Sequence, residues 1–310
     1  MPFDRHSTAL EVARAHDLSG RLTIVTGAGS GLGIETARAL ADAGAQLILG
    51  VRNAEAGRGV ADAIAGETGQ PVETLELNLA DPRSVRTFAA DVNARHEAVH
   101  LLVANAGVSK TPEAHLENGL DVRFATNHLG HFLLANLLLD RLSAQGARIV
   151  MLSSAAHKGK RIDFSDLQWR ARERNDLAAY GESKTANILF AMEATRQWSG
   201  RGIFANAVLP GSVLTGLQRY HGEELKRQIG FILPDGKPNP VMKTVEQGAA
   251  TTLWACCAAE LEGRGGLVLE DCALAIPTGP DTHPWNGYDP TVMVPADAEE
   301  LWRVSERLVA

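Results

Sequence analysis

Two residues one helical turn apart, Tyr180 and Lys184, have the chemistry of an acid–base pair. Side chains four positions apart in a helix lie on the same face, so the ammonium group can approach the phenol. A nearby positive charge favours the phenolate, which lowers the pKa of a tyrosine from about 10 toward neutral pH. A tyrosine with such a pKa can act as a general acid or base. Because the spacing also fits an ordinary half-exposed helix face, other motifs must support the interpretation.

A glycine-rich turn near the N-terminus is typical of a site for a phosphate group. Residues 26–33 read Thr-Gly-Ala-Gly-Ser-Gly-Leu-Gly, between an apolar segment and a helical one. Glycines allow the backbone to turn sharply, and the next helix offers free N–H groups to a pyrophosphate. The turn lacks the Gly-Lys-Ser/Thr ending of a P-loop and the Gly-x-Gly-x-x-Gly spacing of many dinucleotide sites. Unless the turn is purely structural, the residues that contact the dinucleotide are Gly27, Gly29, Ser30, Gly31, Leu32 and Gly33.

The end of the second expected strand bears on the choice of cofactor. Chains that bind NAD usually carry a carboxylate about 20 residues after the glycine turn, for the ribose 2′-hydroxyl. Here those positions are Val51 and Arg52. An arginine at this place can pair with a 2′-phosphate. We therefore predict NADP(H) as the cofactor, with NADPH preferred and NAD still possible; the alternative is that Arg52 is a solvated loop residue.

The elements that must position these residues alternate between strand and helix. Such alternation predicts an α/β fold, a doubly wound Rossmann-type sheet, mostly parallel and seven-stranded, with helices on both faces. We expect one domain, 1–310, because no repeat or linker interrupts the pattern. The expected strands are 21–26, 46–51, 72–79, 99–104, 148–153, 203–209 and 266–269, and the expected helices are 32–43, 54–66, one from 82, 119–142 and one from 177.

Three irregular segments are candidates for binding loops, since long irregular segments in a compact domain often carry function. They are a charged insertion at 157–175, a substrate loop at 211–243 and a C-terminal extension at 272–310. The substrate loop should turn apolar side chains toward a pocket and charged ones outward. The first group is Leu214, Leu217, Tyr220, Ile229, Phe231 and Ile232, and the second is Arg219, His221, Lys226 and Arg227.

Bulk properties narrow the class of protein. The formal net charge is -7 without a basic stripe, which argues against nucleic acid as a partner. The apolar runs are too short to span a bilayer, and we expect neither a signal segment nor a membrane span. Three cysteines without metal-ligand spacing favour a reduced, cytoplasmic setting. His128 and His131 lack a third ligand at a fixed spacing, so we expect core histidines and no metal.

Several ordered motifs together resemble the short-chain dehydrogenase/reductase family over nearly the whole chain. They are the glycine turn at 26–33, Asn105-Ala106-Gly107, Asn127, Ser153-Ser154, Tyr180-x-x-x-Lys184 and the segment Pro210-Gly211-Ser212-Val213-Leu214-Thr215. Within the family, the segments at 127–132, 153–157 and 270–272 are similar to the retinol-dehydrogenase-like and WW-domain-containing oxidoreductase branch. We expect no WW domain in these 310 residues.

The resemblance implies a role for each motif. Tyr180 would exchange a proton with the substrate oxygen, Lys184 would assist it and hold the nicotinamide ribose, Ser154 rather than Ser153 would bind the oxygen, and Asn127 would hold a water in a proton relay. The other residues implied at the cofactor are Asn78, Leu79, Asn105, Ala106, Gly107, Pro210, Gly211, Val213 and Thr215. Asn78 stands where the family usually has an aspartate, which we interpret as tuning of the adenine site. For Thr215 the alternative is a hydroxyl bonded to nearby backbone.

The implied activity is that of a short-chain alcohol dehydrogenase or carbonyl reductase. It would interconvert a hydrophobic or aromatic ketone or aldehyde and its alcohol by hydride transfer. Two alternatives stay open, a cofactor-binding sensor or scaffold and a non-redox lyase or epimerase on the same fold. The helices at 119–142 and from 177 resemble those that pair between subunits in the family, so we expect a homodimer or homotetramer. The identity of the substrate is left open by the sequence.

Overall fold

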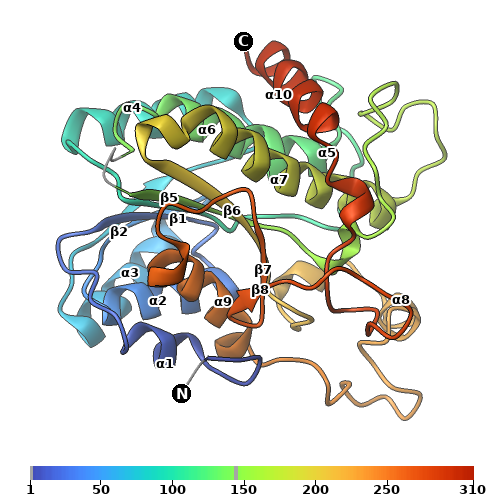
Figure 1. The fold of residues 1–310 in the computed structure, drawn as a ribbon, viewed down its shortest axis with the longest axis horizontal. Helices are drawn as coiled ribbons and strands as arrows, with labels where there is room; N and C mark the ends of the chain where they lie inside the picture. The colour runs from blue at the N-terminus through green and yellow to red at the C-terminus, as the bar shows by residue number, and fades with distance from the viewer. Residues whose placement is uncertain (1–2, 143–145) are drawn as a thin grey trace.

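Eight strands form one central sheet in the computed structural model of the chain, which describes residues 3–142 and 146–310 (Figure 1). The strand order is β3-β2-β1-β4-β5-β6-β7-β8. This is the doubly wound arrangement expected from the sequence, in which the chain starts at β1 and winds outward in both directions. The strands are β1 Leu22–Thr26, β2 Gln46–Val51, β3 Val72–Glu76, β4 Leu101–Ala104, β5 Ala147–Leu152, β6 Ile203–Leu209, β7 Val268–Glu270 and β8 Ala273–Leu274.

The eighth strand was not expected. The first seven strands are parallel, whereas β8 pairs with β7 in antiparallel register, Glu270 opposite Ala273. The two residues between them, Asp271 and Cys272, have φ angles of 52° and 55°. Two central residues with positive φ make the tight turn that suits a twisted hairpin. The pair carries no glycine or asparagine, so a hairpin was not predictable from these residues.

Helices cover both faces of the sheet (Figure 1). One face carries α1, α2, α3 and α9, and the other carries α4, α6, α7 and α10. No helix within residues 3–142 and 146–310 is both long enough and apolar enough to cross a membrane. The helices are α1 Ala9–Ala13, α2 Leu32–Asp42, α3 Ala54–Thr68, α4 Pro82–Arg95, α5 Val122–Phe124, α6 Gly130–Leu137, α7 Asp176–Trp198, α8 Glu223–Gln228, α9 Val245–Cys257 and α10 Pro295–Val309.

Side-chain caps fix the starts of several of these helices. The side chain of Asn53 accepts a hydrogen bond from the amide of Ala56 at the start of α3. At the start of α7, the side chain of Asn175 accepts one from the amide of Ala178. Asp81 caps α4, whose first residue is Pro82, as the sequence predicts. The cap at Asn175 marks the start of α7, the helix that carries Tyr180.

The single helix expected at 119–142 is wrong in its bounds and its continuity. The chain forms the short α5, a π-helical segment from Ala125 to Leu129, and then α6, which ends at Leu137. The carboxylate of Asp121 caps the start by accepting from the amides of Arg123 and Phe124. Short π segments inside helices are frequent at functional sites, and this one contains Asn127.

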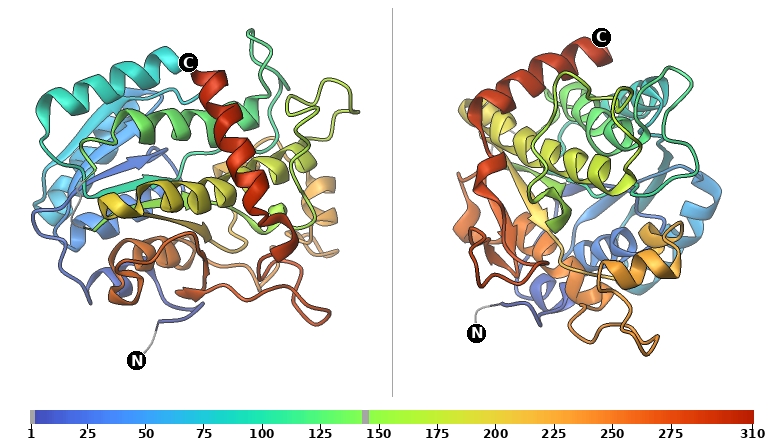
Figure 2. Two further views of the ribbon diagram at one scale, coloured as in Figure 1. Left: turned by 45° about the horizontal axis from the view of Figure 1, so that its top comes forward. Right: turned by 90° about the vertical axis from the view of Figure 1, so that its right-hand side faces the viewer.

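The C-terminal helix α10 packs across α7 on the upper face of the sheet (Figure 2). Trp302 lies edge-on to Phe132 and Trp198, at ring-centre distances of 4.9 and 5.2 Å, and stacks on Phe190 at 5.8 Å. The helix therefore covers part of the α7 surface that the sequence assigns to contacts between subunits. The homodimer or homotetramer stays a prediction, and α10 would have to take part in any such contact through α7.

Candidate active site

A cavity of about 690 Å³ lies at the carboxyl ends of the parallel strands. Its size suits a ligand site, and this edge of a doubly wound sheet is where such folds bind their ligands. The glycine turn, the end of β2, the segment after β4 and the start of α7 all reach it. Of the residues expected at the site, those that line the cavity are Gly27, Gly29, Ser30, Gly31, Leu32, Gly33, Arg52, Asn78, Leu79, Asn105, Ala106, Gly107, Tyr180, Lys184, Pro210 and Thr215.

The glycine turn is held by close backbone contacts that leave no room for side chains. Gly27 has a φ of +68°, and a Cβ atom there would lie 2.8 Å from the Cα of Ala106. A Cβ on Gly33 would overlap the carbonyl oxygen of Gly27. The side-chain NH₂ group of Asn105 donates to the backbone carbonyl of Thr26 at 2.9 Å, which ties the turn to β4. The backbone is thus free to approach a pyrophosphate at the N-terminus of α2, so these residues fit a dinucleotide.

The end of β2 and the segment after β3 form the adjoining wall. Arg52 is exposed and lines the cavity, whereas its neighbour Asn53 is used to cap α3. Asn78 lines the same wall, but its side-chain oxygen accepts from the amide of Ala80 at 3.1 Å. The side-chain NH₂ group of Asn78 can donate a hydrogen bond to a ring nitrogen of adenine.

Tyr180 is almost completely buried at the floor of the cavity. Burial raises the pKa of its phenol to about 12, and a hydrogen bond from the Ser154 side chain acts in the opposite direction. The Lys184 ammonium lies 5.6 Å from the centre of the Tyr180 ring. The sequence predicted that this ammonium would lower the pKa of Tyr180; instead, the loss of solvation of the phenolate exceeds any such effect. At neutral pH the phenol therefore carries its proton.

Lys184 is a buried ammonium group beside the same cavity. Burial lowers its pKa to about 7. Its Nζ donates to the carbonyl of Leu152 at 2.8 Å, and a Cβ atom on Gly107 would lie 3.4 Å from it. An ammonium has three donors, and among the described residues the carbonyl of Leu152 accepts one of them. The other donors can hold ligand hydroxyl groups on the side that Gly107 leaves open.

The two serines after β5 have different surroundings. The hydroxyl of Ser153 donates to the backbone carbonyl of Lys184 at 2.9 Å, so it fastens β5 to α7. The hydroxyl of Ser154 accepts from the amide of Ala156 at 3.2 Å, and the Ser154 side chain acts to lower the pKa of Tyr180. Ser153 is among the residues that line the cavity and Ser154 is not. The choice of Ser154 as the serine that binds a substrate oxygen together with Tyr180 stays a prediction.

Asn127 acts as a brace behind Tyr180 and Lys184. Its amide group donates to the carbonyl of Val108 and to the hydroxyl of Ser183, each at 2.9 Å. Its carbonyl oxygen accepts from the amide of Val108 at 2.8 Å. One side chain thereby joins the π segment, the loop after β4 and α7. Its part in a proton relay stays a prediction.

The two neighbouring histidines are core residues in the structure. His131 bridges the hydroxyl of Thr26, at 2.8 Å, and the backbone carbonyl of Asn127, at 3.0 Å. His128 lies 2.8 Å from the hydroxyl of Ser305 on α10. In the part of the chain that the structure describes, no cluster of three His, Cys, Asp or Glu residues could hold a metal ion.

Only some residues of the loop after β6 line the cavity. Pro210 and Thr215 line it, but Gly211 lies against the Lys243 side chain and Val213 is buried beside Gly248. The hydroxyl of Thr215 accepts from the amide of Leu217 at 3.2 Å. This local bond is the alternative that the sequence left open for Thr215, and a contact with the cofactor would add to it or replace it.

The substrate loop differs from expectation in four apolar residues and in two charged ones. Leu214, Ile229, Phe231 and Ile232 are not among the residues that line the cavity. His221 is buried rather than outward, and its ring lies 3.1 Å from the hydroxyl of Ser109. Arg219 lines the cavity together with Leu217 and Tyr220, although its side chain is exposed. The partner of His221 is 112 residues away in sequence, which is why a local pattern could not reveal it.

Sequence reasoning missed the opposite wall of the cavity. This wall follows the loop after β4 and the start of α5, and it carries no recognisable motif. A run of mainly apolar residues here would have been a weak signal of a binding surface. The residues are Val108, Thr111, Pro112, Leu116, Val122 and Thr126.

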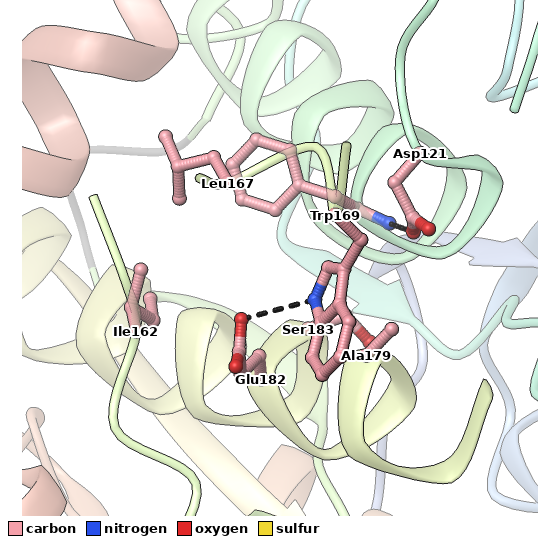
Figure 3. A pocket seen from close by; sticks show the side chains of 8 residues that line it. Asp121, Ile162, Leu167, Trp169, Ala179, Glu182 and Ser183 are labelled. Atoms are coloured by element: carbon pink, nitrogen blue, oxygen red, sulfur yellow. Dashed lines mark hydrogen bonds between the residues drawn. The ribbon is translucent and has the colours of Figure 1, made fainter. Parts of the chain in front are cut away.

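The 157–175 insertion packs on the other side of α7, and none of its residues is among those that line the cavity. Figure 3 shows the Trp169 indole lying over α7, beside a small pocket that Leu167 also lines. The volume of this pocket is about 10 Å³, room for one water at most. The indole of Trp169 donates to Glu182 at 3.2 Å (Figure 3). Arg172 stacks over the same indole and donates to Glu182 at 2.6 Å. The insertion therefore supports the helix of Tyr180 from outside.

Comparisons with known proteins agree with this geometry. A model of the short chain dehydrogenase family matches residues 21–226. The WW domain-containing oxidoreductase of Homo sapiens is 36% identical over 317 residues, which cover 99% of this chain and 72% of that protein. Retinol dehydrogenase 13 of Homo sapiens is 44% identical over 207 residues, covering 66% of this chain and 62% of that protein.

Solved structures share the fold. A crystal structure of an uncharacterised protein from Mycobacterium Paratuberculosis superposes with a TM-score of 0.74 at 30% identity, covering 100% of this chain and 98% of that one. RhlG of Pseudomonas aeruginosa, solved with NADP, superposes with a TM-score of 0.64 at 23% identity, covering 82% and 95%. Given the family match, the relatives and the sheet topology, the chain belongs to the short-chain dehydrogenase family, in the branch of the WW domain-containing oxidoreductases and retinol dehydrogenases.

Proposed function

We propose that the chain is an NADP(H)-dependent oxidoreductase that interconverts a hydrophobic or aromatic ketone or aldehyde and its alcohol. One observation carries the proposal: a buried tyrosine, with the Ser154 side chain close enough to lower its pKa, opens into the cavity that the glycine turn lines. This places a proton donor and a dinucleotide site in one space. A bound nicotinamide would supply the hydride, which is chemistry that the protein itself does not provide.

Tyr180 serves as the acid in the reducing direction. With its pKa raised to about 12, the phenol is protonated and can give its proton to a carbonyl oxygen that is gaining negative charge. Ser154 donates a second hydrogen bond to the same oxygen, which stabilises the developing alkoxide. In the oxidising direction the phenolate must form, and a protonated Lys184 nearby favours it.

Lys184 and Asn127 prepare the site rather than react. The ammonium of Lys184 would hold the ribose hydroxyls of the nicotinamide nucleotide on the side of Gly107. Asn127 fixes α7 through Ser183, whose hydroxyl in turn donates to the carbonyl of Tyr180 at 2.7 Å. The catalytic tyrosine is thus fixed by its own backbone, which keeps the phenol in the orientation needed for proton transfer.

The wall beyond Tyr180 favours a substrate without a carboxylate or phosphate group. Its members are mainly apolar, as in Pro112, Leu116, Val122 and Leu217, with Tyr220 at the rim. The cation Arg219 at this end is exposed to solvent, donates to the carbonyl of Gly216 at 2.8 Å and lies over the ring of Tyr220. A bulky apolar or aromatic group would displace water from this wall and gain hydrophobic stabilisation.

The preference for NADP(H) is proposed from Arg52. Its guanidinium is exposed at the end of β2, where the adenosine ribose would lie, and no carboxylate stands at Val51 to bind a 2′-hydroxyl. Arginine forms two parallel hydrogen bonds to a phosphate, which suits a 2′-phosphate at this position.

The proposal is tested by consumption of NADPH. The purified chain is mixed with NADPH and a panel of bulky aromatic and aliphatic ketones and aldehydes, and the near-ultraviolet absorbance of NADPH is followed. Steady oxidation with at least some members supports the proposal. Tight binding of NADPH without oxidation across the panel would indicate the sensor or scaffold instead, and turnover of a substrate with no net loss of NADPH would indicate a lyase or epimerase.

A further inference from the structure

The backbone at Ser154 is linked by hydrogen bonds, through His157, to a segment that is far away in sequence. His157, which follows Ser154 by three residues, is completely buried. Its Nδ1 lies 2.6 Å from the backbone carbonyl oxygen of Ser154. Its Nε2 lies 3.0 Å from the backbone nitrogen of Asp289 in the C-terminal extension, so the ring bridges two segments that are 132 residues apart.

The two contacts define the state of the ring. A carbonyl oxygen can only accept, so Nδ1 carries the hydrogen. The amide of Asp289 can only donate, so Nε2 must be bare. A neutral imidazole satisfies both contacts at once, and burial lowers the pKa of His157, which keeps the ring in this form.

The loop at 284–289 holds the same backbone at two further residues. The ammonium of Lys158 donates to the carbonyl oxygens of Pro284 and Asn286, at 2.5 and 2.8 Å. The amide of Gly159 donates to the carboxylate of Asp289 at 2.9 Å. Residues 157, 158 and 159 are therefore each bonded to the 284–289 loop.

That loop is itself anchored to the sheet. The amide of Gly287 donates to the carboxylate of Glu270 at 2.7 Å, and Glu270 is a buried residue at the end of β7. The backbone of Tyr288 also exchanges hydrogen bonds with Ile276 and Thr278. The hydrogen bonds that hold residues 157–159 therefore come from a loop that is anchored to the core.

On its other side, the same turn presses against the helix of Tyr180. A Cβ atom on Gly181 would overlap the carbonyl oxygen of Ala156, so the turn lies directly on α7 next to Tyr180. The hydroxyl of Thr185 on α7 donates to the carbonyl of Lys160 at 2.7 Å. The turn after Ser154 is therefore held between α7 and the 284–289 loop.

From these contacts we propose that His157 is a positioning residue, which uses the C-terminal 284–289 loop to fix the Ser154 backbone and so aims the Ser154 hydroxyl at Tyr180. The inference rests on the proposed function of Ser154 and Tyr180. It makes the C-terminal extension, which lies beyond the matched residues 21–226, a part of the catalytic apparatus. Ser154 and Tyr180 touch the substrate oxygen, whereas His157 acts through Ser154.

The test separates the two bonds of the ring. In His157→Phe both are lost while an aromatic ring still occupies the position, and a small misplacement of a catalytic group can lower kcat by roughly 10- to 100-fold. In His157→Asn the side-chain NH₂ can still donate to the Ser154 carbonyl, so most of the loss should be recovered. The dissociation constant for NADPH should change by less than about twofold in both, because the glycine turn is untouched.

Arg161→Ala is the matched control. Arg161 and Asp297 form another bond between the insertion and the C-terminal extension, at 2.6 and 2.9 Å, but Arg161 does not contact Ser154. This variant should keep its kcat. Equal losses in Arg161→Ala and His157→Phe would overturn the proposal, since the effect would then be general loosening, and so would an unchanged kcat in His157→Phe.

A spectroscopic measurement tests the positioning role of His157 without requiring catalytic activity. The chain has three tyrosines, so protein carrying ¹³Cζ-labelled tyrosine gives three signals, and the signal absent from Tyr180→Phe is that of Tyr180. Ser154→Ala should shift this signal at neutral pH, and His157→Phe should shift it in the same direction. The chemical shift of Tyr180 in His157→Asn should lie nearer the wild-type value. An unmoved Tyr180 signal in both His157 variants would overturn the proposal. If the wild type oxidised no NADPH, the proposed function would fail, but this spectrum would still report on His157.

Discussion

The two halves of the cavity are built by different means. The cofactor half lies mainly within 22–107, with Lys184, Pro210 and Thr215 added from later in the chain. It is shaped by backbone: the glycine turn, the strand ends and short-range caps such as Asn53. The substrate half, from 108 onward, is held by side chains that reach more than 100 residues, as His157 does to Asp289 and Arg161 to Asp297. In the first half the function depends on the path of the chain. In the second it depends on individual side chains.

The packing of the two halves follows the same division. All five tryptophans and all three tyrosines lie at position 169 or later. The core around β1 and β2 is mainly small and aliphatic, as in Val25, Leu40 and Leu49, although Trp254 and Phe88 also belong to it. Aromatic side chains bury more surface per residue and pack with specific geometry. Single substitutions should therefore have their largest effects in the substrate half, and the predictions below test this difference in order of expected size.

The largest effect should come from Tyr180→Phe. Removal of the phenol oxygen leaves the carbonyl oxygen without its proton donor, and positioned acid catalysis is worth about 10²- to 10⁴-fold in rate. We expect kcat to fall by this factor while the dissociation constant for NADPH, measured by fluorescence titration, stays within about twofold. A variant with near-normal kcat would show that another group supplies the proton and that the substrate half does not depend on this side chain.

The second effect concerns stability and comes from Trp302→Ala on α10. Trp302 is 5% exposed and contacts three aromatic rings. Truncation of such a residue costs about 3–5 kcal/mol of unfolding free energy, because the lost contacts leave a cavity. Urea unfolding measures the change, and Leu308→Ala, on the same helix but 37% exposed, should cost less than about 1 kcal/mol. Equal costs would mean that α10 does not contribute to the core.

The third effect is a loss of stability in mild acid, caused by the buried histidines of the substrate half. Burial lowers the pKa of His128 to about 3 and that of His131 to about 4. Below about pH 6.5 the unfolded chain binds protons at these positions and the folded chain does not, so stability falls as the pH falls. Between pH 7 and pH 5 each histidine should remove about 2 kcal/mol from the unfolding free energy.

His128→Gln provides the comparison for this measurement, because it removes one titrating group. Burial raises the pKa of Glu35, Glu182 and Glu270, which acts in the opposite sense, so the difference between the two proteins is more informative than either slope. From urea midpoints at pH 7 and pH 5, the variant should lose about 2 kcal/mol less than the wild type. Equal losses of unfolding free energy in the variant and the wild type would show that His128 titrates normally in the folded chain.

The same division explains what the sequence could predict. The strands β2 and β6 have the bounds that their apolar runs indicate, and the glycine turn lies where its spacing predicts, because both are decided within a few residues. The π segment at Asn127 and the burial of His221 were not predicted. Each depends on a distant partner, Val108 and Ser183 for Asn127 and Ser109 for His221, which no local pattern contains.

The pKa of Tyr180 illustrates the limit for chemistry. The spacing to Lys184 gives the direction in which a nearby charge acts, but it says nothing of solvation. The structure adds the burial of the phenol, and this reverses the sign of the shift. Motifs could therefore name the reacting groups, whereas their protonation states required the packing of the substrate half around them.

The smallest effect should come from the cofactor half, in Arg52→Ala. The arginine is exposed, so its hydrogen bond to a 2′-phosphate should be worth only about 1.4 kcal/mol, the low end for a bond to a charged group. We expect kcat/KM for NADPH to fall about tenfold, and kcat/KM for NADH, which has no 2′-phosphate, to change less. The backbone contacts at Gly27 and Gly33 remain, so the dinucleotide should still bind. A loss of both cofactors together would contradict the division, because it would mean that one exposed side chain, rather than the glycine turn, holds the dinucleotide.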